Sequence, residues 1–231
     1  MKAVSKFAGK DRYSVEDLVE ILKALRAPDG CPWDREQDHK SIRRDFLEEC
    51  YEAIEAIDTE NPVLLREELG DVLLQIVFHS TIEEEEGRFD FYDVVSDVAE
   101  KMVVRHPHVF ADTKADTTEE VLTNWDQIKR ETKQQKTNRE VLASVSPAMP
   151  ALMRAQKVRK KAAKMGEVTG DVAALKEKIC AGVQNADEEN GAAVLGTALF
   201  DMTELARKLG VDAEQALFET CRAYIEQFEA K

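Results

Sequence analysis

The chain lacks several of the sequence patterns on which many enzyme classes depend. Its four cysteines are far apart and form no C-x-x-C pair, which disfavours a thiolate zinc site and a disulfide framework and favours reduced thiols. It has no P-loop and no dinucleotide-binding glycine pattern. No run of about 20 apolar residues occurs, and no apolar segment follows Met1, so we expect neither a membrane span nor a secretory signal.

Aromatic residues and turn formers are also scarce, and the 32 basic residues are outnumbered by 46 acidic ones. Aromatic residues make up 6% of the 231 residues, and there are 10 glycines and 6 prolines. This composition, rich in Ala, Leu, Glu and Lys, predicts an all-α protein. The net charge of −14 leaves no basic excess for a nucleic-acid groove or an anionic membrane surface. We therefore expect no nucleic-acid or membrane partner, and a cytoplasmic location.

Two pairs of carboxylates are the strongest sign of chemistry. Glu49 stands three residues before Glu52, and Glu68 three before Asp71, so each pair projects from one face of its helix. In a helical hairpin the four acids would meet. Carboxylates at close range repel one another unless a cation lies among them, and oxygen ligands suit Mg²⁺, with Mn²⁺ as a substitute. The sequence therefore predicts a divalent-metal site of these four residues.

The helices that carry these pairs follow from breakers and periodicity. One is predicted over about His39–Asp58 and the next over about Pro62–Glu86, with Asn61-Pro62 as the break between them. Apolar residues cover most of the circumference of the second helix, so we expect it to be buried. An ionised Asp71 in such a helix is costly unless it is paired or ligates a metal.

Each acidic pair also has a plainer explanation. Acidic helix faces such as that of Glu49 and Glu52 are often merely solvated in a chain with 34% charged residues. Glu68 and Asp71 could instead form an ordinary buried ion pair. Only the combination of the two pairs favours metal binding over both explanations.

Two histidine patterns are weaker candidates for metal sites. His106 and His108 suggest zinc at first sight, but Pro107 separates them and no cysteine joins them. Glu36 and His39 have the spacing of di-iron bundles, but the second copy that such a site needs is missing. We expect neither site.

Cationic and aromatic residues follow the acidic pairs along the chain. Lys101 and Arg105, four residues apart, could meet phosphate oxygens or simply complement the C-terminus of their helix. Trp125 and Lys129 repeat this spacing. The indole could stack on a base and the ammonium could reach a phosphate, or the indole could be ordinary packing.

A weak internal repeat relates the two halves of the chain. The segment 69–74 aligns with 195–200. At that register the four acids meet Leu175, Lys178, Val194 and Thr197. The second copy thus keeps the apolar frame and loses all four carboxylates, so we expect the first half to be the working half.

Six motifs lie in a fixed order along the chain. They are Gly30-Cys31-Pro32-Trp33-Asp34 with Gln37, Leu47-Glu48-Glu49-x-x-Glu52, Glu67-Glu68-Leu69-Gly70-Asp71, Glu85-Glu86-Gly87-Arg88-Phe89, Arg105-His106-Pro107-His108-Val109-Phe110 and Asn124-Trp125-x-x-Ile128-Lys129. In sequence and spacing they resemble the MazG family of all-α nucleoside triphosphate pyrophosphohydrolases. The resemblance covers about residues 15–135, and the segment from Arg154 onward resembles the second domain of tandem members.

The resemblance implies two tandem MazG-like helical-bundle modules, the second degenerate. On this basis we expect a catalytic domain at 1–136, a linker at 137–150 and a degenerate helical domain at 151–231. The acidic residues missing from the second copy place any activity in the first half. Because one hairpin cannot bury its apolar surface alone, we also expect a homodimer.

The resemblance further implies Mg²⁺-dependent hydrolysis of nucleoside triphosphates between the α and β phosphates, giving a nucleoside monophosphate and pyrophosphate. The residues implied to hold Mg²⁺ are Glu49, Glu52, Glu68 and Asp71. Those implied to contact the nucleotide are Lys101, Arg105, Trp125 and Lys129, and Glu48 is our candidate for the base that activates water. The alternatives are a catalytically weak nucleotide-sensing protein and a purely structural helical scaffold.

Overall fold

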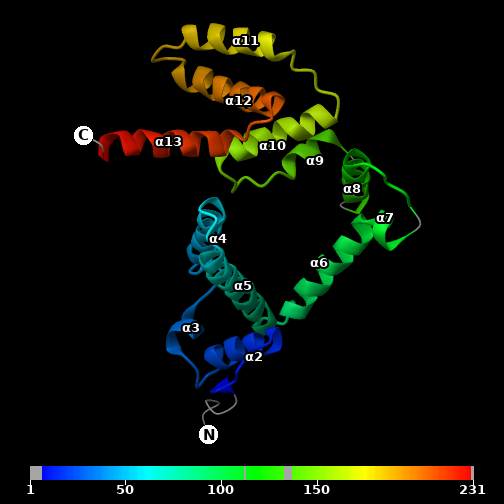
Figure 1. Ribbon diagram of the computed structural model, residues 1–231, viewed down its shortest axis with the longest axis vertical. Coiled ribbons are helices and arrows are strands. Elements are labelled where there is room, and N and C mark those ends of the chain that lie inside the picture. Colours follow the sequence, from blue (N-terminus) through cyan, green and yellow to red (C-terminus); the bar gives the residue numbers. More distant parts are fainter. Residues whose placement is uncertain (1–6, 112, 133–136, 230–231) are drawn as a thin grey trace. The chain divides into compact units, whose positions relative to one another are not determined.

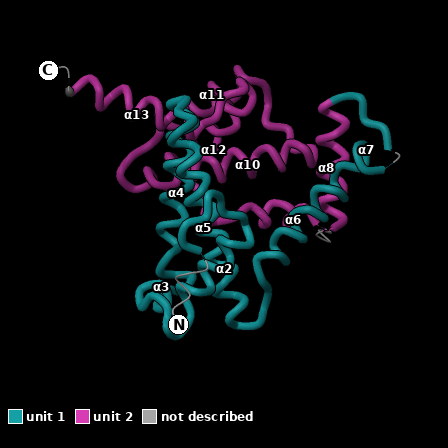
Figure 2. The backbone as a smooth tube through the Cα atoms, turned by 60° about the horizontal axis from the view of Figure 1, so that its bottom comes forward, with its two compact units in different colours: residues 1–117 teal, residues 118–231 magenta. Residues whose placement is uncertain are grey.

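The computed structural model describes residues 7–111, 113–132 and 137–229, and all its regular elements are helices, with no strand in these ranges (Figure 1). The all-α prediction is therefore confirmed. The chain divides into two compact units, a first unit of residues 1–117 and a second unit of residues 118–231 (Figure 2). Within the described residues, no helix combines the length and the apolar character needed to cross a bilayer.

Short connections join the helices of each unit, as is usual in helical bundles. The helices of the first unit are α2 (Val15–Arg26), α3 (Pro32–Glu36), α4 (Arg43–Asp58), α5 (Pro62–Glu85), α6 (Phe91–Arg105) and α7 (Pro107–Phe110). Those of the second unit are α8 (Thr118–Thr132), α9 (Asn138–Ala143), α10 (Ala151–Lys164), α11 (Val172–Gln184), α12 (Gly191–Leu209) and α13 (Ala213–Glu229).

The boundary between the units differs from the predicted end of the first module. We expected that module to continue through residue 136, but α8 belongs to the second unit. The predicted linker at 137–150 contains α9, which begins with a capping box between Thr137 and Glu140. Val141 in this helix is only 7% exposed. This segment is therefore partly folded and packed within the second unit.

Capping residues fix where α2 and α5 begin and end. The Ser14 hydroxyl accepts a hydrogen bond from the Asp17 N–H (3.2 Å), and the Asp17 carboxylate accepts one from the Ser14 N–H (3.1 Å), so the two residues form a capping box at the start of α2. The side chain of Asn61 accepts bonds from two N–H groups in the first turn of α5, where Pro62 takes the first helical position. Gly87, at a φ of 68°, follows the end of α5.

The hydrophobic core of the first unit lies between α2 and the C-terminal half of α5. Its buried residues are Val19, Leu22, Ile42, Val77, Phe78, Ile82 and Phe91. Further apolar residues of both helices, including Leu18 and Leu73, pack around them. Because apolar burial is the main stabilising contribution to folding, this core fixes the C-terminal half of α5.

Arg26 fastens the segment between α2 and α4 to the same end of α5. Its buried guanidinium makes two contacts of 2.7 Å with the Glu85 carboxylate and lies 5.3 Å from the centre of the Phe78 ring. It also donates hydrogen bonds to the carbonyl oxygens of Asp34 (2.5 Å) and Gln37 (3.1 Å). The motif that contains Pro32-Trp33 is therefore held against the core by a residue that the sequence analysis did not single out.

Helices α4 and α5 form the predicted antiparallel hairpin (Figure 1). The expectation that α5 is buried on all sides is wrong for the single chain, because Val63 and Leu69 are 76% and 54% exposed. Only the C-terminal half of α5 belongs to the core with α2, so its N-terminal half has α4 as its main neighbour. On α4, Ile54 and Ile57 are exposed as well.

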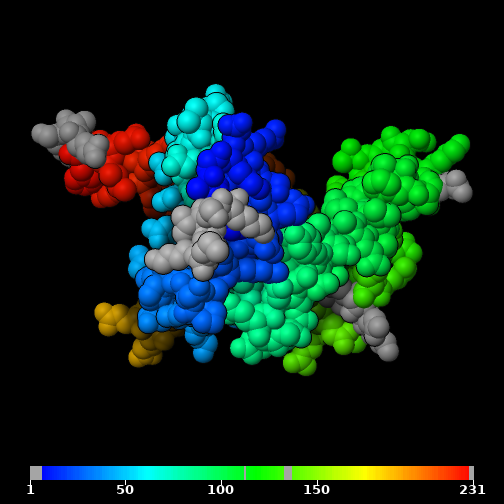
Figure 3. All heavy atoms as spheres, turned by 90° about the horizontal axis from the view of Figure 1, so that it is seen from below, coloured from blue at the N-terminus to red at the C-terminus, as the bar shows by residue number. Residues whose placement is uncertain are grey.

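Helix α6 leaves the core of the first unit as an arm. Phe91 at its start is buried in the core, and the rest of the helix extends away from α5 (Figures 1 and 3). The helix ends at Arg105, as the position of Pro107 predicts. The following residues form the one-turn helix α7.

In the second unit, α10 and α11 both pack against α12. In the first unit, α2 and α4 both pack against α5. The weak repeat in the sequence thus corresponds to two similar hairpins, α4–α5 and α11–α12.

Candidate functional site

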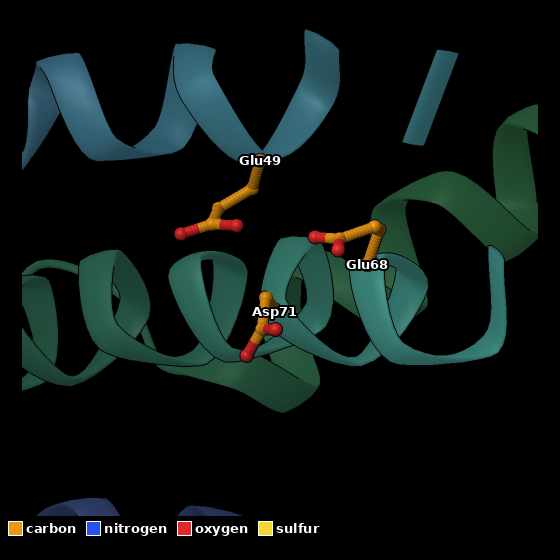
Figure 4. Close-up of side chains that lie close together, drawn as sticks. All are labelled: Glu49, Glu68 and Asp71. Atoms are coloured by element: carbon orange, nitrogen blue, oxygen red, sulfur yellow. The ribbon is translucent and has the colours of Figure 1, made fainter. Parts of the chain in front are cut away.

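Three of the four predicted metal ligands meet between α4 and α5. Glu49 projects from α4 toward α5, from which Glu68 and Asp71 project (Figure 4). Each residue offers one carboxylate oxygen, and these three oxygens lie within 4.8 Å of one another. The short turn before Asn61 brings the two helices together, so the local fold alone assembles this acidic cluster.

Burial makes this arrangement costly for carboxylates. Glu68 is only 7% exposed, and Glu49 and Asp71 are half-buried. Burial raises the pKa of Glu49, and the charge of Asp71 raises it further. Burial and then the charge of Glu52 raise the pKa of Glu68. In the metal-free protein the ionised forms of both carboxyl groups are therefore disfavoured.

A buried ion pair does not explain the cluster. In the described part of the chain, no Lys, Arg or His forms a salt bridge with Glu49, Glu68 or Asp71. A purely solvated face does not explain it either, because all three side chains are at least half-buried. Three converging carboxylate oxygens suit a hard divalent cation such as Mg²⁺ or Mn²⁺, so the donor set fits the predicted metal.

Two further predicted acids of α4 lie at the edge of the acidic cluster. Glu52 is exposed, and its charge raises the pKa of Glu68, so it stands beside the three converging residues. Glu48, the candidate base, is also exposed, and its charge adds to the rise in the pKa of Glu49. Glu48 and Glu52 line a shallow cavity of about 340 Å³ together with Arg44.

The predicted nucleotide contacts lie on helices other than the hairpin. Lys101 and Arg105 are in the last turns of α6, the arm that extends away from α5 (Figure 1). Trp125 and Lys129 are on α8, in the second unit. Lys129 lines an open pocket of about 750 Å³, and Lys161 of α10 lines the same pocket. The hairpin therefore gathers the predicted metal ligands, and the predicted nucleotide contacts are not part of the acidic cluster.

Known proteins resemble the chain around this hairpin and well beyond it. The MazG nucleotide pyrophosphohydrolase domain matches residues 37–110, which include the whole acidic cluster. The chain is 39% identical over 218 residues to the nucleoside triphosphate pyrophosphohydrolase/pyrophosphatase MazG of Thermotoga maritima, and this alignment covers 93% of the chain and 84% of that protein. The chain belongs to the MazG family.

Two other relatives are also similar to the chain, the second over a shorter stretch. The nucleoside triphosphate pyrophosphohydrolase of Escherichia coli K12 is 41% identical over 213 residues, which cover 88% of the chain and 81% of that protein. The nucleoside triphosphate pyrophosphohydrolase of Mycolicibacterium smegmatis is 38% identical over 152 residues, or 65% of the chain and 46% of that protein. Family membership supports the resemblance that the motifs indicated.

Neither histidine pattern forms a metal cluster in the described residues of this MazG chain. The ring nitrogen Nδ1 of His106 lies 2.6 Å from a backbone carbonyl oxygen of its own helix. His39 instead stacks on His79 of α5, with their Nδ1 atoms 2.8 Å apart, and its Nε2 lies 2.5 Å from the Glu83 carboxylate. His39 thus anchors the segment before α4. Its partners lie 40 and 44 residues away, and no local spacing indicates them.

The second hairpin of this MazG chain has no acidic residue at the positions of the four predicted metal ligands. Leu175 is buried at 1% exposure in place of Glu49, and Val194 replaces Glu68. Lys178, in place of Glu52, forms an ion pair of 2.8 Å with Asp201, which is 2% exposed and also bound by Arg159 at 2.6 Å. Outside the first hairpin, the described residues contain no cluster of three metal-ligating side chains.

Proposed function

We propose that the chain hydrolyses nucleoside triphosphates between the α and β phosphates, giving a nucleoside monophosphate and pyrophosphate, with a divalent cation held by the α4–α5 hairpin. The observation that carries the proposal is the convergence of Glu49, Glu68 and Asp71 with no cationic partner among the described residues. The printed names of the relatives from T. maritima and E. coli support the reaction class. Mg²⁺ is the proposed ion and Mn²⁺ its substitute.

The proposed division of labour assigns each residue one task. Glu49, Glu68 and Asp71, with Glu52 beside them, hold the cation, which when bound neutralises the polyphosphate and polarises the α-phosphoryl group. Glu48 accepts a proton from the attacking water, a task that its solvent-exposed carboxylate allows. The proposed nucleotide contacts are Lys101 and Arg105 for phosphate oxygens, Trp125 for the base, and Lys129 for a phosphate.

The exposed apolar surface of the first unit supports a homodimer as part of the proposal. Leu47, Ile54 and Ile57 of α4 and Val63 and Leu69 of α5 are each 47% exposed or more. A surface of this kind destabilises a free monomer in water and is typical of subunit interfaces. Light scattering coupled to gel filtration would detect twice the chain mass of 26.1 kDa if the proposal is right.

A pyrophosphate-release assay over a panel of ribo- and deoxynucleoside triphosphates tests the activity. With Mg²⁺, we expect turnover by the wild type and a loss of at least about 100-fold in Glu52→Gln and Asp71→Asn, since loss of electrostatic stabilisation at a reacting phosphoryl or acyl group typically costs this much. Asp58→Asn is the matched control, because Asp58 is an exposed acid of the same hairpin outside the acidic cluster.

Two results would contradict the proposal. Triphosphate binding with no turnover by the wild type would favour the nucleotide-sensing alternative. An Asp71→Asn variant that retains full turnover would exclude the acidic cluster as the active centre.

A further inference from the structure

Gln75 of α5 carries a buried oxygen with no partner. The residue is 9% exposed, and its Oε1 atom has no hydrogen-bond partner in the described structure. Buried polar atoms are nearly always bonded, and an unsatisfied one destabilises the fold. Such an atom in the middle of a helix that packs against its hairpin partner therefore suggests a ligand that the protein alone does not supply.

The position of Gln75 follows from its neighbours on both sides. Asp71, one turn before it, meets Glu49 of α4 in the acidic cluster. His79, one turn after it, meets the ring of Phe46 of α4, with ring centres 5.6 Å apart. Helix geometry puts Gln75 between these two residues on the same face of α5, and from this we deduce that it faces α4 between Phe46 and Glu49, next to the acidic cluster.

Asp45 of α4 lies on the same side of the acidic cluster as Gln75. Asp45 is half-buried, stands one turn before Glu49 on its helix, and its charge acts on the Glu49 carboxylate. The seam between the helices therefore continues from the carboxylates of Glu68 and Asp71 to further oxygen donors. Next to Asp45, the ring of Phe46 packs edge-on against the His79 ring.

The second hairpin provides an independent comparison. In the register of the internal repeat, 126 residues later, Asp201 occupies the position of Gln75. Its buried carboxylate binds two cationic groups, the side chains of Arg159 (2.6 Å) and Lys178 (2.8 Å). The same site on the second hairpin is thus a place where side-chain oxygens bind positive charge. In the first hairpin, neither cationic side chain has a counterpart bound to Gln75 in the described residues.

We infer that the Oε1 atom of Gln75 is an additional oxygen donor of the cation centre, next to Asp71. This inference rests on the proposed function, because it assumes that the acidic cluster holds a divalent ion. Amide oxygens are ordinary ligands of hard divalent cations, either directly or by accepting a hydrogen bond from a coordinated water. Gln75 would then be a metal-positioning residue outside the four carboxylates of the motif.

Calorimetry with Mn²⁺ alone, on the full chain, tests the inference together with thermal unfolding in a chelator. Gln75→Leu removes the unsatisfied oxygen at similar volume. We expect it to raise the metal-free unfolding midpoint and to weaken Mn²⁺ binding by about 10-fold or more, as loss of supporting groups around a metal typically does. A merely structural glutamine would not produce these two opposite effects.

Thr81→Val is the matched control. Thr81 is buried on the same helix, and its hydroxyl donates a bond of 2.9 Å to the Val77 carbonyl oxygen. This variant should lower the unfolding midpoint and leave Mn²⁺ affinity unchanged. Gln75→Glu is the second test variant, because an added carboxylate should lower the metal-free midpoint and increase the rise in midpoint that Mn²⁺ causes.

The outcomes separate this inference from the proposed function. If the wild type takes up no Mn²⁺, the proposed function fails. If the wild type binds Mn²⁺ and Gln75→Leu binds it within about twofold, only the role of Gln75 is overturned. Should Gln75→Leu not fold, Gln75→Glu decides: a larger Mn²⁺-induced shift than in the wild type supports the role, and an equal or smaller shift overturns it.

Discussion

The two hairpins of this chain have a similar architecture, but they differ in whether cationic side chains are paired with their buried carboxylates. In α4–α5, three carboxylates converge with no cationic side chain paired to them in the described residues. In α11–α12, the buried Asp201 is neutralised by Lys178 and Arg159. The first solution leaves a place for an external cation, whereas the second supplies the positive charge from the protein itself. Lys178 of α11 and Arg159 of α10 thus provide the positive charge that a metal ion would otherwise have to provide.

The net charge of the chain is also distributed unequally between the two units. Residues 1–117 contain 28 acidic and 15 basic residues, whereas residues 118–231 contain 18 and 17. Helix α10 alone carries six basic residues and no acidic one. Nearly all of the net charge of −14 therefore belongs to the unit that contains the acidic cluster.

The largest expected difference between the hairpins is in turnover. Glu68→Gln should reduce pyrophosphate release by at least about 100-fold, because it removes a buried cation ligand. Lys178→Ala, in the second hairpin, should leave turnover within about threefold, because Lys178 is neither a proposed metal ligand nor a proposed nucleotide contact and pairs with Asp201 instead. Initial rates at saturating Mg²⁺ measure both. Comparable losses in the two variants would show that the hairpins are not functionally distinct.

The next largest effect concerns stability. Arg159→Met leaves the buried Asp201 with only the exposed Lys178 as a partner, and breaking a buried ion pair in this way typically costs about 3–5 kcal/mol of unfolding free energy. Urea denaturation measures the change. Lys157→Met, on the exposed face of the same helix, should stay within about 0.5 kcal/mol.

The contributions of Glu204 and Glu68 to the stability of their hairpins should change with pH in opposite directions. The bond to Arg207 lowers the pKa of Glu204, so this ionised carboxylate stabilises the fold at neutral pH, and the stabilisation is lost as the pH falls through the lowered pKa. Burial raises the pKa of Glu68, so its ionised form destabilises the metal-free fold at neutral pH, and the penalty disappears as the pH falls through the raised pKa.

The variants Glu204→Gln and Glu68→Gln test these two pH dependences. Their thermal unfolding midpoints are measured in the presence of a chelator, from about pH 8 to about pH 4. Near neutrality the first should have a lower midpoint than the wild type and the second a higher one, and both differences should shrink toward acid. Saturating Mg²⁺ should reverse the advantage of Glu68→Gln, because only the wild type retains the full ligand set. A Glu68→Gln variant less stable than the wild type without metal would argue against strain in the acidic cluster.

The smallest expected effect comes from the helix caps. Asn61→Ala and Asp171→Ala each remove a side-chain acceptor from a helix N-terminus, at about 1 kcal/mol each. Only Asn61→Ala should also weaken Mn²⁺ binding, by less than about tenfold, because Glu68 lies two turns after this cap. Equal metal affinity in both variants would mean that the start of α5 does not position Glu68.

Much of the fold followed from local sequence signals. The capping box at Ser14, the break at Asn61-Pro62 and the stop before Pro107 all lie where the helices begin or end. The start of α4 was predicted four residues too early, at His39. The side chain of Asp38 instead accepts bonds from the N–H groups of the next residues and holds them in a turn, a competition that helix periodicity does not show.

The candidate site was predicted in part for the same reason. Carboxylates three residues apart share a helix face, so the sequence indicated the acidic pairs before any tertiary structure was known. The sequence did not show that the oxygen of Gln75 is buried without a partner. That Glu52 stands beside the acidic cluster, and not within it, depends on how α4 packs against α5.

The sequence by itself determined which segments are helical and which face of each helix is acidic or apolar, because caps, breakers and helical periodicity act over a few residues. Tertiary structure alone decided which charges are compensated. The pairs of Arg26 with Glu85, His39 with Glu83, and Arg159 with Asp201 span 59, 44 and 42 residues. Packing selects such partners only after the helices meet, and it left the acids between α4 and α5 without a cation among the described side chains.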